Sequence, residues 1–412
     1  MSSLARNRDY RLLWMGQALS ESGFHTAMIA FPLLVLALTG SPAASGLVLG
    51  VVAAAQLIAG LPAGALVDRW NRKKVMLWCE AVQAAAVAGL AVALWQRVAT
   101  VPLLVAVALV MGVCRALFEP AEEACLPRLV TAEQVPAAVA MNAARGYAGQ
   151  LSGTALGGFL FAIGRMVPFV FDACTHLLAF AGLVFVRVPP RPVEPRPVRH
   201  LGREILAGLR WVWHQPPLRV TTLCVVVLNF FFSAYYLVII MLAAERGVPP
   251  GEIGVMAAML GAGGILGALA APALHRRISP YVLIAGVFWA LTALTPIAVL
   301  LPNGYLLGAL FAAMALLPPA ANTTINAYQL LITPDDLRGR LSAVMAVVAG
   351  VAGAAGPAFG GWLVDALPGS DAVLVCAGAI AAVTVVVTLN RTMRSFPRQI
   401  SAESPAAMDS PR

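Results

Sequence analysis

Twelve apolar runs, each about 20 residues or longer, follow one another along the chain and leave little sequence between them. A helix needs about 20 apolar residues to cross the hydrocarbon core of a bilayer. Only 11% of the 412 residues are charged, whereas soluble domains carry about 25%. We therefore predict an all-α integral membrane protein with twelve transmembrane helices. The predicted spans are 12–38, 44–66, 75–96, 101–123, 138–163, 166–187, 218–242, 252–274, 281–301, 304–330, 341–366 and 371–390.

The basic residues lie mostly in the segments that share one side of these spans. If the N-terminus is cytoplasmic, 23 of the 28 lysines and arginines fall in cytoplasmic segments. Arg97, Arg165 and Arg246 are then outside, and Arg115 and Arg145 lie within spans. Cytoplasmic loops of membrane proteins carry an excess of basic residues. We therefore predict a multi-pass protein of the inner (plasma) membrane, with both termini in the cytoplasm.

The composition argues against several classes of function. A net charge of +9 would suit a nucleic acid, but the arginines are scattered between apolar runs, so we expect no nucleic-acid partner. The six cysteines lie in or beside apolar runs, and no Cys and His spacing matches a zinc site, so we expect neither disulfides nor a metal. The only lysines, Lys73 and Lys74, belong to no phosphate-binding loop. We expect no cofactor, and an ion gradient or the substrate's own gradient as the energy source.

A proline-rich segment divides the chain near its middle. Five prolines between Val188 and Pro197 exclude a continuous helix there. The following stretch, 201–214, has the pattern of an amphipathic helix, which would lie on the membrane surface or serve as a solvated linker. We predict a six-helix bundle over 1–187, a cytoplasmic linker over 188–217, a second six-helix bundle over 218–390 and a disordered cytoplasmic tail over 391–412.

The two halves repeat a glycine motif. Gly153-Thr154-Ala155-Leu156-Gly157-Gly158 matches Gly356-Pro357-Ala358-Phe359-Gly360-Gly361, which lies 203 residues later. Small residues let transmembrane helices approach closely, so we expect these positions to pack helices together. Two halves related by internal repetition are typical of transporters.

A charged loop joins the second and third spans. Five of the eleven residues from Gly64 to Lys74 are charged, so the loop must lie at a membrane face. We expect Gly64 to let two helix ends approach, and Asp68 to bond free N–H groups at a helix start. Asn71 tolerates a positive φ, which would preserve a turn there.

This loop resembles the loop between helices 2 and 3 of the major facilitator superfamily. The matching residues are Gly64, Leu66, Asp68, Arg69, Arg72, Lys73 and Lys74. Further stretches resemble the drug-exporter-like branch, which includes macrolide-efflux proteins and the enterobactin exporter. These stretches are Thr39-Gly40-Ser41, Pro120-Ala121, Ala140-Met141-Asn142 and Leu337-Arg338-Gly339-Arg340.

The resemblance implies a twelve-helix fold that works by alternating access, with the charged loop as a conformational switch formed by Gly64, Asp68, Arg69, Arg72 and Lys73. It also implies export, because a Gly-Pro-x-x-Gly-Gly element in span 5 is associated with exporters. Thr154 stands where that proline is usual, which weakens the implication.

Ionisable residues within spans are costly and are therefore candidates for function. Glu21 and His25 lie one turn apart in span 1, and Glu21 is about 15 Å beyond Arg11, near the midplane. Apolar surroundings favour a neutral carboxyl group, so Glu21 is a candidate to bind and release a proton, with His25 as its partner or relay. A structural hydrogen-bonded pair is the alternative.

Spans 4 and 6 hold the other candidates for proton coupling. Arg115 and Glu119 are again one turn apart; Arg115 is either a relocated form of an arginine found in proton-coupled relatives or a partner of Glu119. For Asp172 in span 6 a structural role is favoured. We also expect Arg145 to cap a helix or pair with Glu119, and Glu80 to reach Arg72 or Lys73. Glu122 and Glu123 are expected to be solvated or paired with the basic loops.

The second half has few charges within its spans but several polar and aromatic side chains. Such groups suit an apolar substrate cavity, although the aromatics would equally suit a membrane interface. The candidates are Asn229, Tyr235, Tyr236, Asn322, Asn326 and Gln329.

Together these features predict a monomeric secondary transporter that exports lipophilic small molecules by proton antiport within the lipid bilayer. The alternatives are an importer or a lipid flippase on the same fold, a polytopic membrane enzyme, and a sensor that carries no flux.

Overall fold

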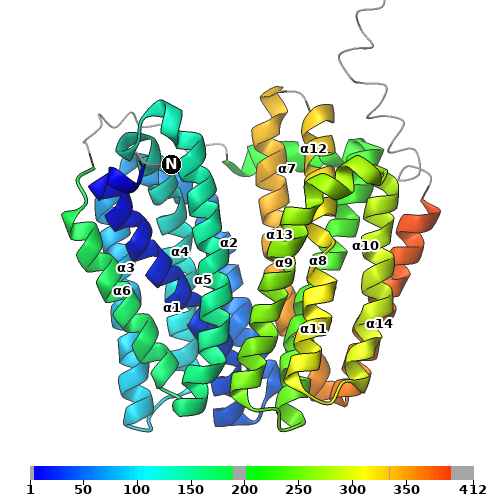
Figure 1. The fold of residues 1–412 in the computed structure, drawn as a ribbon, viewed down its shortest axis with the longest axis horizontal. Helices are drawn as coiled ribbons and strands as arrows, with labels where there is room; N and C mark the ends of the chain where they lie inside the picture. The colour runs from blue at the N-terminus through cyan, green and yellow to red at the C-terminus, as the bar shows by residue number, and fades with distance from the viewer. Residues whose placement is uncertain (1–3, 189–200, 334, 391–412) are drawn as a thin grey trace, which may run out of the picture.

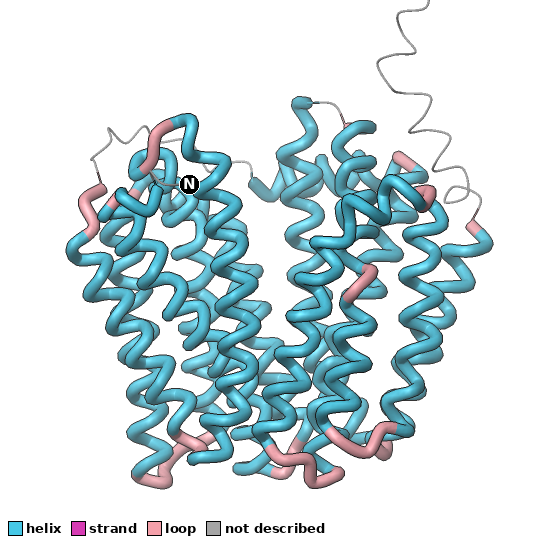
Figure 2. The backbone as a smooth tube through the Cα atoms, viewed as in Figure 1, coloured by secondary structure: helices cyan, strands magenta, loops and turns pink. Residues whose placement is uncertain are grey.

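The computed structural model describes residues 4–188, 201–333 and 335–390, apart from a few side chains within helices. The described residues are almost entirely helical, with short loops (Figure 2). The predicted tail, 391–412, and residues 189–200 of the predicted linker lie outside the described residues. The long helices are α1 (Arg8–Thr39), α2 (Pro42–Arg69), α3 (Arg72–Trp95), α4 (Val101–Leu129), α5 (Val135–Ile163), α6 (Val167–Phe185), α8 (Pro216–Glu245), α9 (Pro250–Arg277), α13 (Asp335–Ala366) and α14 (Gly369–Leu389).

Shorter helices complete the second half. Helix α10 (Pro280–Leu294) continues as η3 (Thr295–Leu300), and α11 (Gly304–Ala315) is followed after a short break by α12 (Pro318–Ile332). The break falls inside the predicted run 304–330, where two prolines at 318 and 319 remove backbone N–H donors. Helix α7 (Leu201–His214) is the predicted amphipathic segment, and it buries Val212 against Leu341 and Val344.

Eleven of the described helical segments are long and apolar enough to cross a membrane. Helix α5, which carries Asn142, Arg145 and Gln150, is the twelfth long segment of the arrangement. The prediction of an all-α membrane protein with the twelve-helix fold is therefore confirmed.

Polar side chains cap several helices at the loops. Asn7, Ser41, Asn71 and Asn303 each accept a hydrogen bond from the backbone N–H three residues ahead, over 2.9–3.2 Å. Such caps satisfy N–H groups that have no partner inside the helix. Asn71 has φ −70°, so it works as the N-cap of α3 rather than through the positive φ that we expected.

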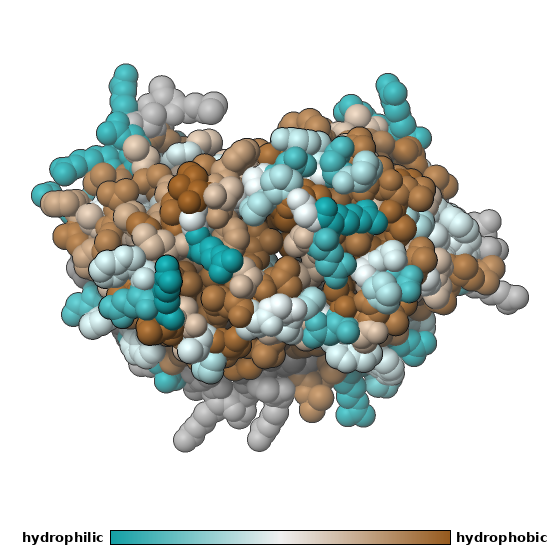
Figure 3. All heavy atoms as spheres, turned by 90° about the horizontal axis from the view of Figure 1, so that it is seen from below, coloured by the Kyte–Doolittle hydropathy of each residue, from teal (hydrophilic) through white to brown (hydrophobic). Residues whose placement is uncertain are grey.

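Helices α1–α6 pack on one side of the molecule and α8–α14 on the other (Figure 1). The two groups meet where α2 contacts α13 and where α5 contacts α9. They diverge toward the end that carries the N-terminus and α7. We call this the basic end, because Arg69, Arg72 and Lys73 in the α2–α3 loop region and Arg276 and Arg277 of α9 belong to it. Seen from the opposite end, the atoms of the two groups form a nearly continuous surface (Figure 3).

The repeated glycines pack helices within each half. A β-carbon at Gly153 or Gly157 of α5 would clash with the backbone of α1, at Ser22 and Thr26 respectively. In the second half, a β-carbon at Gly360 would lie 2.6 Å from the carbonyl oxygen of Ala234 in α8. Gly356 packs on the same helix. The first helix of each half is therefore held by the same motif.

The last glycine of each motif contacts the other half. A β-carbon at Gly158 would clash with Pro250 and Gly254 of α9, and one at Gly361 would clash with Pro42 of α2. The carbonyl oxygen of Pro357 lies against Gly46 of α2. These contacts lie at the opposite end from the basic end, where Ser41 also donates a hydrogen bond of 3.1 Å to Asp365.

Gly64 does not have the close contact that we expected. A β-carbon there would meet nothing within 4 Å. Asp68 lies in the last turn of α2, and its side chain is outside the described part of the structure.

Candidate functional site

Arg115 of α4 joins two acidic residues in the first half. Its Nη1 lies 3.1 Å from Oε2 of Glu21 in α1, and its Nη2 lies 3.3 Å from Oε1 of the same carboxylate. Its Nε lies 2.9 Å from Oε1 of Glu119, one turn further along α4. The guanidinium carbon is also 4.5 Å from the centre of the Phe24 ring, an arrangement that attracts a cation. Arg115 therefore forms ion pairs with two carboxylates.

The backbone explains why these groups meet. Glu21 and His25 are four residues apart on α1, so they share a face, and His25 Nε2 lies 3.7 Å from Glu21 Oε2. Gly149 lets α5 approach this face, because a β-carbon there would lie 2.6 Å from the β-carbon of Glu21. The side chain of Glu119 is 48% exposed, whereas that of Glu21 is 14% exposed. Glu119 thus connects the group to the solvent.

A second group of polar side chains is more deeply buried. Oε2 of Glu80 in α3 lies 2.6 Å from Nδ1 of His176 in α6. Gln17 of α1 donates a 2.8 Å hydrogen bond to Oε1 of Glu80, and the hydroxyl of Ser20 lies 3.4 Å from both carboxylate oxygens. His176 Nε2 lies 3.3 Å from Oδ1 of Asp172. Three helices therefore contribute to one buried network.

A third contact holds α4 to α5. Arg145 donates two hydrogen bonds to the carboxylate of Glu122, over 2.5 and 2.9 Å, and both side chains are buried. Bidentate contacts of this kind are strong and fix the geometry of both partners. Glu122 is therefore neither solvated nor bound to a basic loop, and the partner of Arg145 is Glu122 rather than Glu119.

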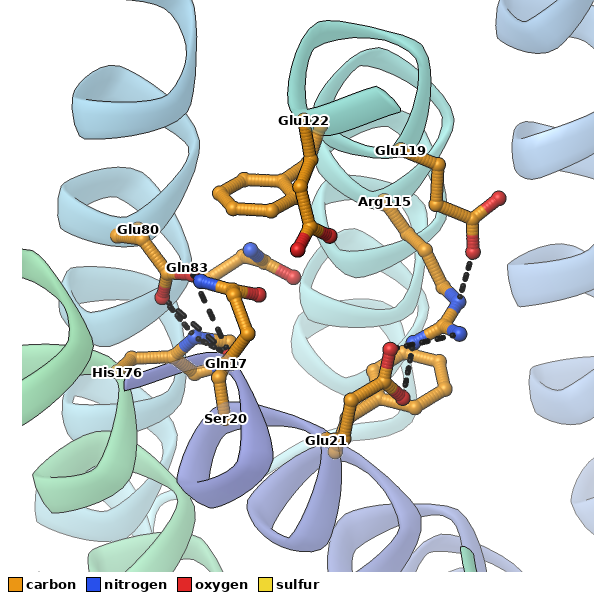
Figure 4. Close-up of a pocket in the computed structure, with 11 residues that line it drawn as sticks. Gln17, Ser20, Glu21, Glu80, Gln83, Arg115, Glu119, Glu122 and His176 are labelled. Atoms are coloured by element: carbon orange, nitrogen blue, oxygen red, sulfur yellow. Dashed lines mark hydrogen bonds and ion pairs between the residues drawn. The ribbon is translucent and has the colours of Figure 1, made fainter. Parts of the chain in front are cut away.

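Most residues of the first two groups, though not His25 or Asp172, line one pocket in the first half together with Glu122 (Figure 4). Glu80 and His176 lie on one side of it, and Glu21, Arg115 and Glu119 lie on the other. Gln17, Ser20, Phe24, Gln83 and Phe118 complete the lining. Among the described residues, no group of His, Cys, Asp and Glu side chains has the arrangement of a metal site.

The sequence predicted the contacts within a helix better than those between helices. Arg115 and Glu119 are paired, as the alternative for Arg115 required. The contact of Arg115 with Glu21 was missed, although each residue was singled out. The prediction for Glu80 was wrong, because its side chain turns toward α1 and α6 and not toward Arg72 or Lys73.

The charged loop between α2 and α3 is held to neighbouring helices. Arg72 donates a 3.0 Å hydrogen bond to the carbonyl of Ala124 in α4, and Lys73 donates a 2.8 Å hydrogen bond to the carbonyl of Val184 in α6. Cations near the C-terminal turns of helices complement the partial negative charge there. Arg69 is exposed at the end of α2.

The polar candidates of the second half lie in different surroundings. Tyr235 is fully buried, packs edge-on against Phe311 and donates a 3.1 Å hydrogen bond to the carbonyl of Thr295. Tyr236 is half-buried against the same ring. The remaining candidates are Gln329, which is buried, and Asn229, Asn322 and Asn326, which are exposed.

A helical membrane protein with buried ion pairs facing a pocket, and with two packed groups of helices that diverge at one end, has the architecture of a membrane transporter. The chain belongs to the major facilitator family described as transmembrane secretion effector, whose model matches residues 2–411. It is therefore a transporter and not an enzyme.

Two of the named proteins that resemble the chain in sequence are exporters. The chain is 29% identical to the multidrug efflux pump Tap of Mycolicibacterium fortuitum over 339 residues, which cover 79% of this chain and 81% of that protein. It is 26% identical to the enterobactin exporter EntS of Escherichia coli over 358 residues, covering 84% and 82% of the two chains.

Solved structures share the fold at low sequence identity. A bacterial homologue of the human lysosomal transporter Spinster, in an inward-facing and unoccupied conformation, has a TM-score of 0.70 at 16% identity and covers 97% of this chain and 99% of its own. A bacterial homologue of the iron transporter ferroportin, in an inward-facing state, has a TM-score of 0.72 at 16% identity, with coverage of 92% and 98%.

Proposed function

We propose that this transporter exports lipophilic small molecules by proton antiport, with Glu21 as the group that couples protons to transport. The observation that carries the proposal is the position of Arg115 between Glu21 and Glu119. Glu21 is the fourteenth residue of the 32-residue helix α1, and so lies near the middle of a membrane-spanning helix. Groups at that depth are expected to act on ions or substrate.

The charges of this group suit proton exchange. Two carboxylates around one guanidinium leave a net negative charge in surroundings of low polarity, so one proton would neutralise the group. Protonation of Glu21 would weaken its two hydrogen bonds to Arg115, which would then be held by Glu119 alone. A change of this kind at the contact between α1 and α4 is a means of coupling protonation to helix movement.

The arrangement of the two helix groups supports alternating access. We assign the basic end to the cytoplasm, in keeping with the excess of basic residues in cytoplasmic loops. The conformation described here would then be open to the cytoplasm and closed outside by the glycine contacts. In the proposed cycle the charged loop, with Gly64, Asp68, Arg69, Arg72 and Lys73, tunes the balance between the two states. The hydrogen bonds of Arg72 and Lys73 to α4 and α6 give it the necessary attachment.

The substrate is proposed to be a lipophilic compound of the drug or secondary-metabolite class, including siderophores. The names of the efflux relatives support this class and the direction of transport. The exposed Asn229, Asn322 and Asn326 are the candidates for orienting polar contacts on the second half. Tyr235 is excluded from this set in the present conformation, because its side chain is buried in the core. We propose that the working unit is a monomer.

Reconstitution into liposomes tests the proposal. A pH gradient is imposed, and uptake of a lipophilic fluorescent dye, and separately of enterobactin, is followed against the substrate gradient. Uphill movement that an uncoupler abolishes supports proton antiport. Downhill movement that is indifferent to the pH gradient would favour a uniporter, and movement of labelled phospholipid alone would favour a flippase.

A further inference from the structure

The buried network around His176 has no part in the proposed coupling step. Glu80, His176 and Asp172 come from α3 and α6, and their side chains are at most 2% exposed. They lie at hydrogen-bond or ion-pair distance in a row, with His176 between the two carboxyl groups. A buried row of an acid, an imidazole and a second acid is able to move protons along its length.

The charges of the row do not balance when all three groups are ionised. Two carboxylates and one imidazolium carry a net charge of −1. Among the described residues, no arginine or lysine lies within ion-pair distance of Glu80 or Asp172. An uncompensated charge in a buried site is strongly destabilising. One additional proton would remove that charge.

Asp172 is the natural position for the additional proton. Glu80 accepts a hydrogen bond from Gln17 and contacts Ser20 and His176, which suits an ionised carboxylate. In contrast, neither oxygen of Asp172 has a hydrogen-bond partner among the described residues, and the same is true of His176 Nε2. Gly23 of α1 leaves the space for this carboxyl, since a β-carbon there would lie 2.6 Å from Asp172 Oδ1.

We propose that Glu80, His176 and Asp172 form a second proton-binding site, which alternates between a net charge of −1 and a neutral state by taking up one proton on Asp172. The proton comes from water in the pocket, where Glu80 and His176 form part of the wall. The proton returns to the pocket by the same route. In each direction the imidazole of His176 accepts a proton at one ring nitrogen and releases one from the other. No other reactant is needed.

Several other charged or titratable groups face this site or its pocket. Those of the neighbouring elements are Glu21 of α1, Cys79 of α3, Cys114, Arg115, Glu119 and Glu122 of α4, and Arg145 of α5. Helix α1 contacts both proton sites, through Gln17 and Ser20 on one side and through Glu21 on the other. A role of the second site in transport rests on the proposed proton antiport, but its occupation by a proton does not.

Infrared spectroscopy of the full-length protein in liposomes tests the assignment directly. A protonated carboxyl group has a C=O stretching band that is separate from the bands of carboxylates and amides. We expect such a band in a titration over the pH range in which the protein stays folded. The band should move when aspartate is labelled with ¹³C at the side-chain carboxyl, and this version needs no substitution. Asp172→Asn should remove it, whereas the exposed Asp371→Asn should keep it.

The outcomes separate this site from the coupling group. Glu21→Gln should retain the aspartic acid band even if it stops uphill transport. His176→Gln should leave the band but make it insensitive to pH, because the partner that stabilises the ionised Asp172 is gone. No aspartate-sensitive band, or a band that never changes with pH in the wild-type protein, would overturn the proposal, whatever the transport assay shows.

Discussion

Arg115 and Glu21, which are 94 residues apart in the sequence, are joined by two hydrogen bonds across α4 and α1. Glu119, the second partner of Arg115, is about half-exposed. The same guanidinium therefore holds a helix contact together and fixes the surroundings of the acid that we propose to titrate.

Loss of Arg115 should cost more than loss of the whole group. Arg115→Ala leaves two carboxylates without their cation, which we expect to destabilise the protein by about 2 kcal/mol. Arg115→Ala combined with Glu21→Ala and Glu119→Ala removes the uncompensated charge and should recover part of that loss. Thermal unfolding in detergent measures the effect. If the losses of stability in the single variants add up to the loss in the triple variant, the three groups are independent.

Glu21→Gln mimics the permanently protonated acid and should abolish uphill, pH-driven efflux. Exchange of substrate down its gradient should persist, because helix movement does not require ionisation of this residue. Glu21→Asp should keep partial activity with an altered pH profile. Uphill transport by Glu21→Gln with wild-type pH dependence would exclude Glu21 as the coupling group and leave Glu119 and Asp172 as the next candidates.

A bulky side chain at Gly158 should hold the two helix groups apart at the end opposite to the basic end. Gly158→Val inserts atoms where α9 lies against α5, and overpacking typically costs about 1–3 kcal/mol. Spin labels at Thr39 and Leu367 should move further apart in this variant. Gly89→Val is the matched control, since a β-carbon at Gly89 meets nothing within 4 Å. An unchanged label distance in a folded Gly158→Val protein would contradict the expectation.

The assignment of the basic end to the cytoplasm predicts the labelling of single cysteines. In a background with Cys174→Ala, which removes the exposed native thiol, Arg165→Cys should react with an impermeant reagent on intact cells. Arg276→Cys should react only after the cells are permeabilised. The reverse pattern would invert the whole arrangement, including the direction in which the described conformation opens.

Asp68→Asn should slow transport while the amount of folded protein stays unchanged. The reason is its place in the charged loop, which we propose to tune the balance between the two conformations. Initial transport rates, compared with those of the exposed Glu133→Gln, measure the effect. A wild-type rate from a well-expressed Asp68→Asn variant would show that Asp68 has no part in the proposed switch.

The sequence was sufficient for the membrane helices because length and apolar composition determine what crosses a bilayer. The segment 201–214 was also found with the bounds of α7, because its pattern of apolar and basic residues has the helical period. The break between α11 and α12 was missed, even though two successive prolines mark it. The unbroken apolar run 304–330 predicts a single helix, but the prolines remove backbone N–H donors and interrupt it.

The candidate site was predictable only along single helices. The spacing of Glu21 and His25, or of Arg115 and Glu119, places each pair on one face whatever the rest of the chain does. The contacts of Glu80 with His176 and of Glu122 with Arg145 depend on which helices are neighbours and how each is rotated. Those relations arise from packing, to which the glycines of α5 contribute, and no single segment contains them.

The glycine contacts between α5 and α9 and between α2 and α13 consist largely of backbone. Because glycine has no rotamers, separating these surfaces requires no side chain to repack and frees none to block the opening. If the end opposite to the basic end opens in the proposed cycle, the walls uncovered at these glycine contacts will present mainly backbone to a substrate. In the proposed direction of export, these positions would offer a leaving compound few specific contacts and so would favour its release.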